Sequence, residues 1–262
     1  GNLSIMPISL LDTVFFSKRF ISRTLPSLYL PLKSLYQKIA SVIFSRNLDK
    51  LAIVFGTDKY CVHQYTAHYQ NHFNQLRLKE LILLEIGVGG YKNPREGGNS
   101  LRMWKHYFPK SHISGIDIYD KSALVEDRIT IFQGSQNDPD FLNSVLKTIG
   151  PVDIVIDDGS HINEHVLTSF KVIFPQMSPN GIYVVEDTHT SYLPRSGGDS
   201  KHLNNLNTTV GFFKSLADEL NHSAIKDSGY KMVFSPHHLS SIHFYKNLVI
   251  IKKGENEGSP HK

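Results

Sequence analysis

Two pairs of adjacent carboxylates and one histidine are the residues of this sequence best suited to chemistry. Asp157 and Asp158 follow a short apolar run, and His161 comes three residues after the second aspartate. Glu186 and Asp187 follow another apolar run in the same way. Like charges side by side raise the free energy of a fold unless an opposite charge offsets them. The elements that carry the two pairs indicate what that opposite charge is.

Five short apolar runs, separated by helix-length segments, predict the elements that position these residues. The runs that we expect to form strands are residues 81–86, 113–118, 129–132, 152–156 and 181–185. The segments that we expect to form helices lie around residues 100–107, 138–149 and 162–174. Strands that alternate with helices form parallel sheets with right-handed crossovers. The sequence therefore predicts an α/β fold with a doubly wound, mostly parallel sheet.

The end of the chain follows a different pattern. Residues 240–245 and 248–251 flank only Lys246 and Asn247, which is the spacing of a β-hairpin. An antiparallel hairpin would bring the sheet to seven strands and close one of its edges. Such a hairpin is unlike a plain dinucleotide-binding fold, and it is typical of S-adenosylmethionine-dependent methyltransferases of the common α/β class.

The expected strand order brings the two acidic pairs together. In a doubly wound sheet ordered 3-2-1-4-5, the fourth and fifth strands are neighbours, about 5 Å apart. Carboxylates that close require a cation, and oxygen ligands favour Mg²⁺, Ca²⁺ or Mn²⁺ over Zn²⁺. The alternative is that one aspartate of each pair only caps the following helix. Two pairs at adjacent strand ends favour a metal site.

His161 is the candidate general base. An imidazole with a near-neutral pKa is the usual group that removes a proton from a hydroxyl. The chain has 14 histidines, so the position of His161 beside the acidic residues carries this prediction rather than its residue type. His189, which follows the second acidic pair, is a weaker candidate.

Glycines after the first predicted strand indicate a ligand that approaches the backbone closely. Glu85, Gly87 and Gly89 form an ExGxG pattern at the carboxyl end of that strand, where such folds bind cofactors. The pattern is neither a GxGxxG that opens directly into a helix nor a P-loop, because no Gly-Lys-Ser/Thr follows. A longer loop, YKNPREGGNS, intervenes before the helix. This arrangement suits a cofactor that has no pyrophosphate.

Polar residues at the ends of other strands fit a nucleoside. Asp117 ends the second strand, where a carboxylate can accept hydrogen bonds from both hydroxyls of a ribose. Gln133 and Gln136 follow the third strand and are expected to reach an adenine edge. We assign Asp157 to the same site, either facing the cofactor or orienting its neighbours. These residues together predict a cofactor that contains a nucleoside.

Several longer motifs resemble one known family. The segments LLEIGVGGY, GGNSLRMWKHYFP, GIDIYDKS, IDDGSHIN and GIYVVEDTHTSYLPRSGG are similar, in the same order and spacing, to the metal-dependent sugar O-methyltransferases of macrolide biosynthesis (the mycinamicin and macrocin type). The resemblance covers residues 56–198. It implies S-adenosyl-L-methionine as the methyl donor and Mg²⁺ held by Asp158, Glu186 and Asp187. It also implies that His161 is the base and that Asp117 binds the ribose.

A segment upstream of the first strand also takes part in this resemblance. The stretch that begins Gly56-Thr57-Asp58-Lys59 and continues through His63, Tyr65 and Tyr69 is similar to a GTDK-H-Y stretch of these and related enzymes. Two interpretations remain open: the segment closes over the methionine end of the cofactor, or it is a packing motif.

The first part of the chain differs in composition from the rest. We expect residues 1–55 to form a basic and apolar helical segment and residues 56–262 to form a methyltransferase domain. The apolar runs of the first segment are cut by Asp12, Pro26 and Pro31 and are too short to span a membrane.

The preferred interpretation of residues 1–50 is that amphipathic helices cover the main domain or form an oligomer contact. The alternative is a contact with a membrane surface or a lid over an apolar substrate. We therefore expect a homo-oligomer that is cytoplasmic or membrane-peripheral. Because the sequence begins with Gly1, we expect the natural N-terminus to lie elsewhere.

Composition excludes several classes of partner. The 262 residues carry a net charge of +4 that is dispersed, with no basic run interleaved with aromatics, so we expect no nucleic-acid partner. The single cysteine, Cys61, excludes an intramolecular disulfide and a cysteine-rich metal site.

We expect a small-molecule acceptor that bears a sugar or a diol. The alternatives are a methyltransferase of a catechol, a non-catalytic cofactor-binding scaffold and, less favoured, a nicotinamide dehydrogenase.

Overall fold

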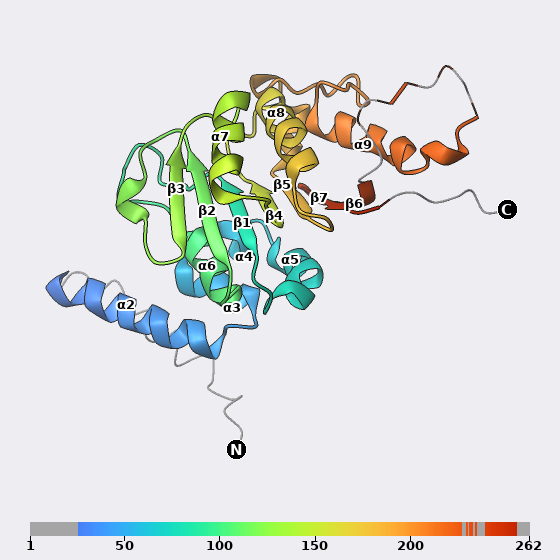
Figure 1. The fold of residues 1–262 in the computed structure, drawn as a ribbon. Coiled ribbons are helices and arrows are strands. Elements are labelled where there is room, and N and C mark those ends of the chain that lie inside the picture. The colour runs from blue at the N-terminus through green and yellow to red at the C-terminus, as the bar shows by residue number, and fades with distance from the viewer. Residues whose placement is uncertain (1–25, 227–228, 230, 233, 235–238, 256–262) are drawn as a thin grey trace.

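Seven strands form one sheet in the order β3-β2-β1-β4-β5-β7-β6 (Figure 1). The computed structural model describes residues 26–226, 229, 231–232, 234 and 239–255. The strands are β1 Ile82–Ile86, β2 His112–Asp117, β3 Ile129–Gln133, β4 Ile154–Asp157, β5 Ile182–Glu186, β6 Leu239–Tyr245 and β7 Leu248–Lys253. Strands β1 to β5 are parallel, whereas β7 is antiparallel to both β5 and β6. The predicted fold class, with its closing hairpin, is confirmed.

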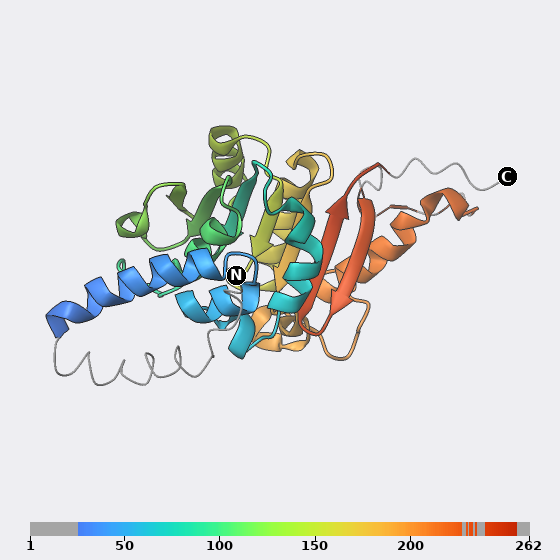
Figure 2. The same ribbon diagram turned by 90° about the horizontal axis from the view of Figure 1, so that it is seen from below.

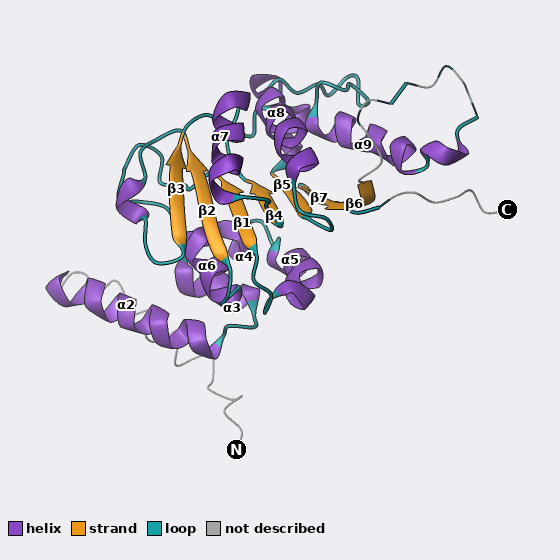
Figure 3. Cartoon of the chain, in the orientation of Figure 1, coloured by secondary structure: helices purple, strands orange, loops and turns teal. Residues whose placement is uncertain are grey.

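Helices lie on both faces of the sheet (Figure 3). Those of the first half are α2 Pro26–Ile43, α3 Leu48–Phe55, α4 Asp58–Cys61, α5 Thr66–Phe73 and α6 Asn99–Tyr107. Those of the second half are α7 Pro139–Ile149, α8 Asn163–Ile173 and α9 Thr209–Leu220. Short 3₁₀ turns are η1 Asn74–Leu76, η2 Ser122–Leu124, η3 Phe174–Gln176, η4 Thr188–Tyr192, η5 Pro194–Ser196 and η6 His222–Ala224.

Two buried apolar layers hold the helices to the sheet, because successive side chains of a strand point to opposite faces. In β5, Ile182 and Val184 join the layer that includes residues of α3, α5 and α6. Tyr183 and Val185 join the layer that includes residues of α7, α8 and α9. All four are nearly or fully buried, which explains why the central strands read as continuous apolar runs rather than alternating ones.

Helix α2 contains Pro31, the sixth residue from its start. A proline at that position lacks the N–H that would bond to the carbonyl four residues earlier, so it weakens the helix locally without ending it. Helix α3 is part of the main core, since Leu51, Ala52 and Phe55 belong to the same buried cluster as Trp104. The division predicted after residue 55 stays a prediction.

Seen from below, α5 lies beside the β6–β7 hairpin (Figure 2). His68 of α5 stacks on Tyr245 of β6 with ring centroids 3.8 Å apart, and the His72 ring lies 3.0 Å from the Tyr245 hydroxyl. These contacts fix α5 over the end of β5 that carries Glu186. Among the described residues, no helix combines the length and the apolar character that crossing a membrane requires.

Candidate active site

A cavity of about 1160 Å³ opens at the carboxyl ends of β1, β2 and β4. Parallel sheets of this kind bind ligands at that edge, beside the point where the strand order reverses. The side chains and backbone that line it come from segments far apart in the sequence. Its lining includes Asp58, Gly87, Val88, Gly89, Asp117, Gln136, Asp158 and His161. The sequence prediction of a cofactor crevice at this edge agrees with the position of the cavity.

Gly87 shapes the floor of this cavity. Its backbone φ is +96°, and a Cβ added there would lie 2.1 Å from the carbonyl oxygen of Asp158. No side chain fits at this position, so only glycine allows the loop after β1 to pass close to the loop after β4. The close approach keeps the cavity open to a ligand that contacts the backbone of both loops.

Asp117 lies at the cavity wall and holds two neighbouring loops. Its Oδ2 accepts a hydrogen bond of 3.0 Å from the Val88 N–H, and its Oδ1 accepts one of 2.9 Å from the Tyr119 N–H. The carboxylate is only partly buried. Each oxygen keeps a further lone pair, so the group is able to accept hydrogen bonds from a ligand as well.

The two glutamines predicted for the cofactor site have different surroundings. Gln136 is buried, lines the cavity and accepts a hydrogen bond of 2.7 Å from the Ser160 N–H. Gln133 is exposed, does not line the cavity and donates to the Ile118 carbonyl at 3.4 Å. The geometry supports a ligand contact by Gln136 and gives none for Gln133.

Asp157 is buried behind the cavity wall rather than in it. Its carboxylate accepts hydrogen bonds from Gln136 Nε2 at 3.0 Å, from Ser169 at 2.9 Å and from Tyr183 at 3.3 Å. Through Gln136 it supports the loop that carries Ser160. Of the two interpretations left open for Asp157, this position favours the one in which it orients its neighbours.

The surroundings of Asp157 predict a pH-dependent stability. Burial raises its pKa from 3.8 to about 6, although the hydrogen bonds from Ser169 and Gln136 act in the opposite direction. The folded protein therefore binds more protons than the unfolded chain between these two pH values, and its stability falls as pH rises through that window. We expect this contribution to total about 3 kcal/mol.

Asp157→Asn removes this contribution. Urea unfolding of both proteins between pH 4 and pH 7 should show the stability of the wild type, relative to the variant, falling by about 3 kcal/mol. A difference that stays constant or grows with pH would contradict the assignment.

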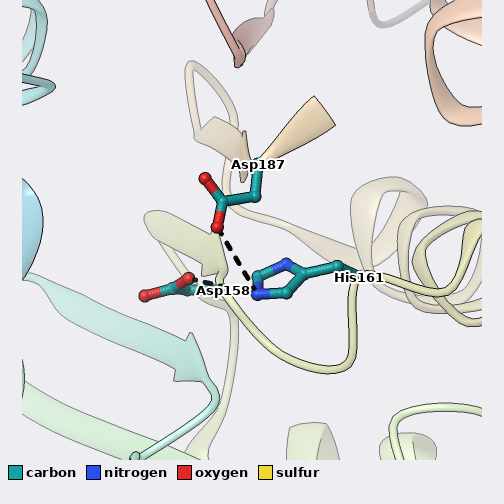
Figure 4. A group of neighbouring side chains, drawn as sticks. All are labelled: Asp158, His161 and Asp187. Carbon is teal, nitrogen blue, oxygen red and sulfur yellow. Dashed lines mark ion pairs between the residues drawn. The ribbon is translucent and has the colours of Figure 1, made fainter. Parts of the chain in front are cut away.

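Asp158, His161 and Asp187 come together at the edge of the cavity (Figure 4). His161 Nε2 lies 3.9 Å from Asp158 Oδ1 and 3.7 Å from Asp187 Oδ2. One ligand atom of each residue lies within 4.8 Å of those of the other two. His161 and Asp187 both have left-handed backbones, with φ of 54° and 52°. Non-glycine residues with such backbones often occur at functional sites.

The helix-cap alternative for the two aspartates is wrong. The residue at the N-cap of α8 is Ile162, not Asp158. Asp187 does occupy the N-cap position of η4, but its side chain makes no capping hydrogen bond there. His189 lies exposed on the same short turn.

Glu186 faces a lysine that the sequence analysis did not assign to the site. Lys59 Nζ lies 2.7 Å from Glu186 Oε1, 2.7 Å from Asp158 Oδ2 and 3.3 Å from Glu85 Oε1. Burial lowers the pKa of Lys59, but the three carboxylates outweigh it and raise the pKa well above its usual value. Glu186 is buried as well, and burial raises its pKa. The ammonium therefore partly offsets the charge of the acidic residues.

Glu85 is fully buried beside this lysine and does not line the cavity. Burial raises its pKa to about 7. The charge of Lys59 and hydrogen bonds from Ser100 and Lys59 act in the opposite direction. Glu85 therefore belongs to the buried group of charges around Lys59, behind the cavity wall.

The segment around Lys59 directs its polar side chains at the acidic residues. The Tyr65 hydroxyl donates to Asp187 Oδ1 at 2.7 Å, and the Tyr69 hydroxyl donates to Glu186. His63 Nδ1 lies 3.4 Å from Asp187 Oδ1. Lys59 is 99 residues from Asp158 and 127 from Glu186 along the chain, so no local pattern predicts these contacts. The GTDK-H-Y resemblance was the one signal in the sequence that this segment lies near the site.

The residues fit both groups that the resemblance implies. Asp158 and Asp187 bring two carboxylates together at the cavity edge, with the His161 imidazole beside them, and carboxylate oxygens are suitable ligands for a divalent cation. The cavity beside them is lined by backbone, by Asp117 and by Gln136, which is a suitable lining for a nucleoside. The ligand roles of the individual residues remain predictions.

Comparison with known proteins agrees with this fold and site. No protein-family model matches the chain. The chain is 48% identical over 212 residues to demethylmacrocin O-methyltransferase of Streptomyces fradiae, covering 80% of this chain and 54% of that protein. It is 44% identical over 213 residues to mycinamicin VI 2''-O-methyltransferase of Micromonospora griseorubida, covering 80% and 53%. The chain thus spans about half the length of the curated relatives it matches.

Solved structures of a related methyltransferase also match this chain. The MycE methyltransferase of the mycinamycin biosynthetic pathway, in complex with Mg and SAH, matches with a TM-score of 0.77 and 44% identity, covering 80% of this chain and 55% of that one. The MycE complex with Mg, SAH and mycinamycin VI matches with a TM-score of 0.75 and 43% identity, covering 82% and 57%.

The sheet order, the antiparallel closing hairpin and the cavity at the strand ends define the fold of the S-adenosylmethionine-dependent methyltransferases. Within that class, the chain is a homologue of the sugar O-methyltransferases of macrolide and tetracenomycin compounds over about 80% of its length.

Proposed function

We propose that the chain carries an S-adenosylmethionine-dependent, Mg²⁺-dependent O-methyltransferase that acts on a hydroxyl of a sugar or of a glycosylated natural product. The observation that carries this proposal is the convergence of Asp158, His161 and Asp187 at the mouth of the cavity. A base and two carboxylates beside a nucleoside-sized cavity are the parts that methyl transfer to an alcohol requires.

The cofactor occupies the cavity in this proposal. Gly87 and Gly89 allow the cofactor to approach the backbone closely, and Asp117 accepts hydrogen bonds from its ribose. Gln136 lies where the adenine ring is expected. Glu85, buried beyond the cavity wall, attracts the amino group of the methionine part. S-Adenosylmethionine, when bound, supplies an electrophilic methyl group on a sulfonium.

Asp158 and Asp187 would hold the divalent cation, together with Glu186, which shares Lys59 with Asp158. Bound Mg²⁺ would supply a positive charge that stabilises the developing charge on the acceptor oxygen. Tyr65 donates to Asp187 and Tyr69 donates to Glu186, so the segment after Gly56 positions both carboxylates.

His161 acts as the general base. Its Nε2 points at Asp158 and Asp187, toward the place where the acceptor hydroxyl must lie if the cation is to stabilise it. Nε2 takes the proton of that hydroxyl as the oxygen gains the methyl group. The two carboxylates then stabilise the imidazolium that forms. General-base catalysis of this kind contributes about a hundredfold or more.

The test is a turnover assay with defined acceptors. Protein, S-adenosylmethionine and Mg²⁺ are incubated with a macrolide that carries a free sugar hydroxyl or with a simple catechol, and the products are analysed by mass spectrometry. We expect methylation of the glycoside and its loss after chelation. Methylation of the catechol alone would contradict the sugar assignment. Calorimetry that shows no binding of S-adenosylhomocysteine would contradict the methyltransferase assignment itself.

Helix α2 bears on the proposed partners. Its exposed side chains include Leu32, Leu35, Ile39 and Val42. An apolar stripe that faces solvent favours a contact, and we propose a second copy of the chain as the partner. The alternative partner of this stripe is a membrane surface. The rest of the N-terminal segment, residues 1–25, lies outside the described part of the chain. The cytoplasmic location stays a prediction. Sedimentation velocity and co-sedimentation with anionic vesicles distinguish the two partners.

A further inference from the structure

Lys59 is a buried charge beside the candidate site that the proposed mechanism leaves without a role. Its side chain is 1% exposed, and its ammonium lies within 3.3 Å of oxygens from Glu85, Asp158 and Glu186. These residues come from four separate elements: α4 for the lysine, then β1, the loop after β4 and the end of β5. The lysine therefore joins the strands at the point where the acidic residues end them.

Two of the three carboxylates that Lys59 contacts are the ones proposed to hold the divalent cation. Asp158 presents its Oδ2 to Lys59 at 2.7 Å, and its Oδ1 faces His161 at 3.9 Å. Glu186 presents Oε1 to Lys59 at 2.7 Å and accepts from Tyr69 through the same oxygen. A cation bound by Asp158 and Glu186 would thus share both carboxylates with the ammonium.

We propose that Lys59 is a positioning residue: its ammonium keeps Asp158 and Glu186 in place before the divalent cation binds, and it limits how tightly that cation is held. The inference rests on the proposed metal site. The physical reason is that one positive charge near several carboxylates stabilises them, whereas two positive charges near the same carboxylates repel each other.

In the part of the chain that the structure describes, the other buried lysines, Lys121 and Lys253, donate to backbone carbonyls instead. Lys253, for example, is 8% exposed and donates to the carbonyl oxygens of Pro175 at 2.8 Å and Met177 at 2.6 Å. Its role is to satisfy backbone carbonyls at the other end of the sheet. Lys253→Met is therefore a matched control, since it removes a buried ammonium without altering the acidic residues.

The experiment compares Mn²⁺ binding and thermal unfolding in the wild type, Lys59→Met and Lys253→Met. Mn²⁺ is titrated by electron paramagnetic resonance, and melting is recorded with EDTA and with Mn²⁺. In Lys59→Met we expect a lower melting temperature in EDTA and a larger rise on adding Mn²⁺. We also expect the dissociation constant for Mn²⁺ to fall by about tenfold or more, since a nearby positive charge is removed. Lys253→Met should lower stability and leave Mn²⁺ binding unchanged.

A second variant covers the case in which Lys59→Met does not fold. Lys59→Met combined with Glu85→Gln removes one positive and one negative charge, so the net charge of the buried cluster is unchanged. This double variant should still bind Mn²⁺ more tightly than Glu85→Gln alone.

Three results would distinguish the claims. Mn²⁺ affinity that is equal in the wild type and in Lys59→Met would overturn the role of Lys59 and leave the metal site standing. Weaker binding in the variant would show that the ammonium supports the cation rather than limits it, and it would also overturn the proposal. A wild type that binds no Mn²⁺ would contradict the metal site itself.

Discussion

Replacing His161 with alanine is expected to lower the rate of methyl transfer by about a hundredfold or more while S-adenosylhomocysteine binds as before. The reason is that Nε2 of His161 is the basic nitrogen that faces Asp158 and Asp187 at the cavity edge. Initial rates with saturating acceptor, together with calorimetric titration of S-adenosylhomocysteine, measure the two quantities separately.

The backbone of His161 calls for a second variant. Its φ of 54° is unfavourable for alanine, so a loss of activity in His161→Ala could reflect a distorted loop. Asparagine tolerates this conformation but cannot act as a base, and His161→Asn should show the same loss. His112→Ala is the control, because His112 is exposed at the start of β2 and contacts Thr130. Full activity in His161→Asn would show that this residue is not the base.

Replacing Asp158 is expected to remove metal binding and activity together. Asp158 lies between the buried Lys59 and the proposed base: Lys59 contacts one of its carboxylate oxygens, and His161 lies near the other. Loss of the cation's contribution, which amounts to several kcal/mol, corresponds to a rate lower by at least about a hundredfold. Steady-state rates at increasing Mg²⁺ and Mn²⁺ titration of Asp158→Ala measure both effects.

Two comparisons separate this effect from a general loss of stability. Asp158→Asn keeps the shape of the side chain and removes its charge, so it should lose metal binding as the alanine variant does. Asp153→Asn changes an aspartate just before β4 whose Oδ2 accepts a hydrogen bond of 2.8 Å from the Ile82 N–H. It should lower stability and leave the metal requirement intact. If Asp158→Ala or the chelated wild type methylates at full rate, the metal assignment is wrong.

The sheet and the helices between its strands could be predicted from the sequence, whereas α4, α5 and α9 were not. The five apolar runs, the helices between them and the two-residue hairpin turn at Lys246 and Asn247 agree with the observed elements to within two residues or so. Central parallel strands are buried on both faces, so they form continuous apolar runs that are easy to recognise.

The candidate site could be predicted in part. Asp158, His161 and Asp187 were expected together because they follow neighbouring strands, and they do lie together. Gln133 and Asp157, which were assigned to the cofactor site, do not line the cavity. Both are the last residues of their strands, β3 and β4, whereas the sequence analysis ended these strands one residue earlier. Successive strand residues point to opposite faces, so an error of one residue in a strand end changes the face that a side chain is expected to take.

The sequence alone determined the sheet order and the convergence of the acidic residues, since both depend on local apolar runs and on the topology that they permit. Only the tertiary structure decided what neutralises those residues in the absence of a bound cation. Lys59 reaches Asp158 and Glu186 across 99 and 127 residues of chain, and no local pattern encodes such a pairing. The pairing arises because α4 is packed against the carboxyl ends of β1, β4 and β5, where a buried ammonium is stable only among carboxylates.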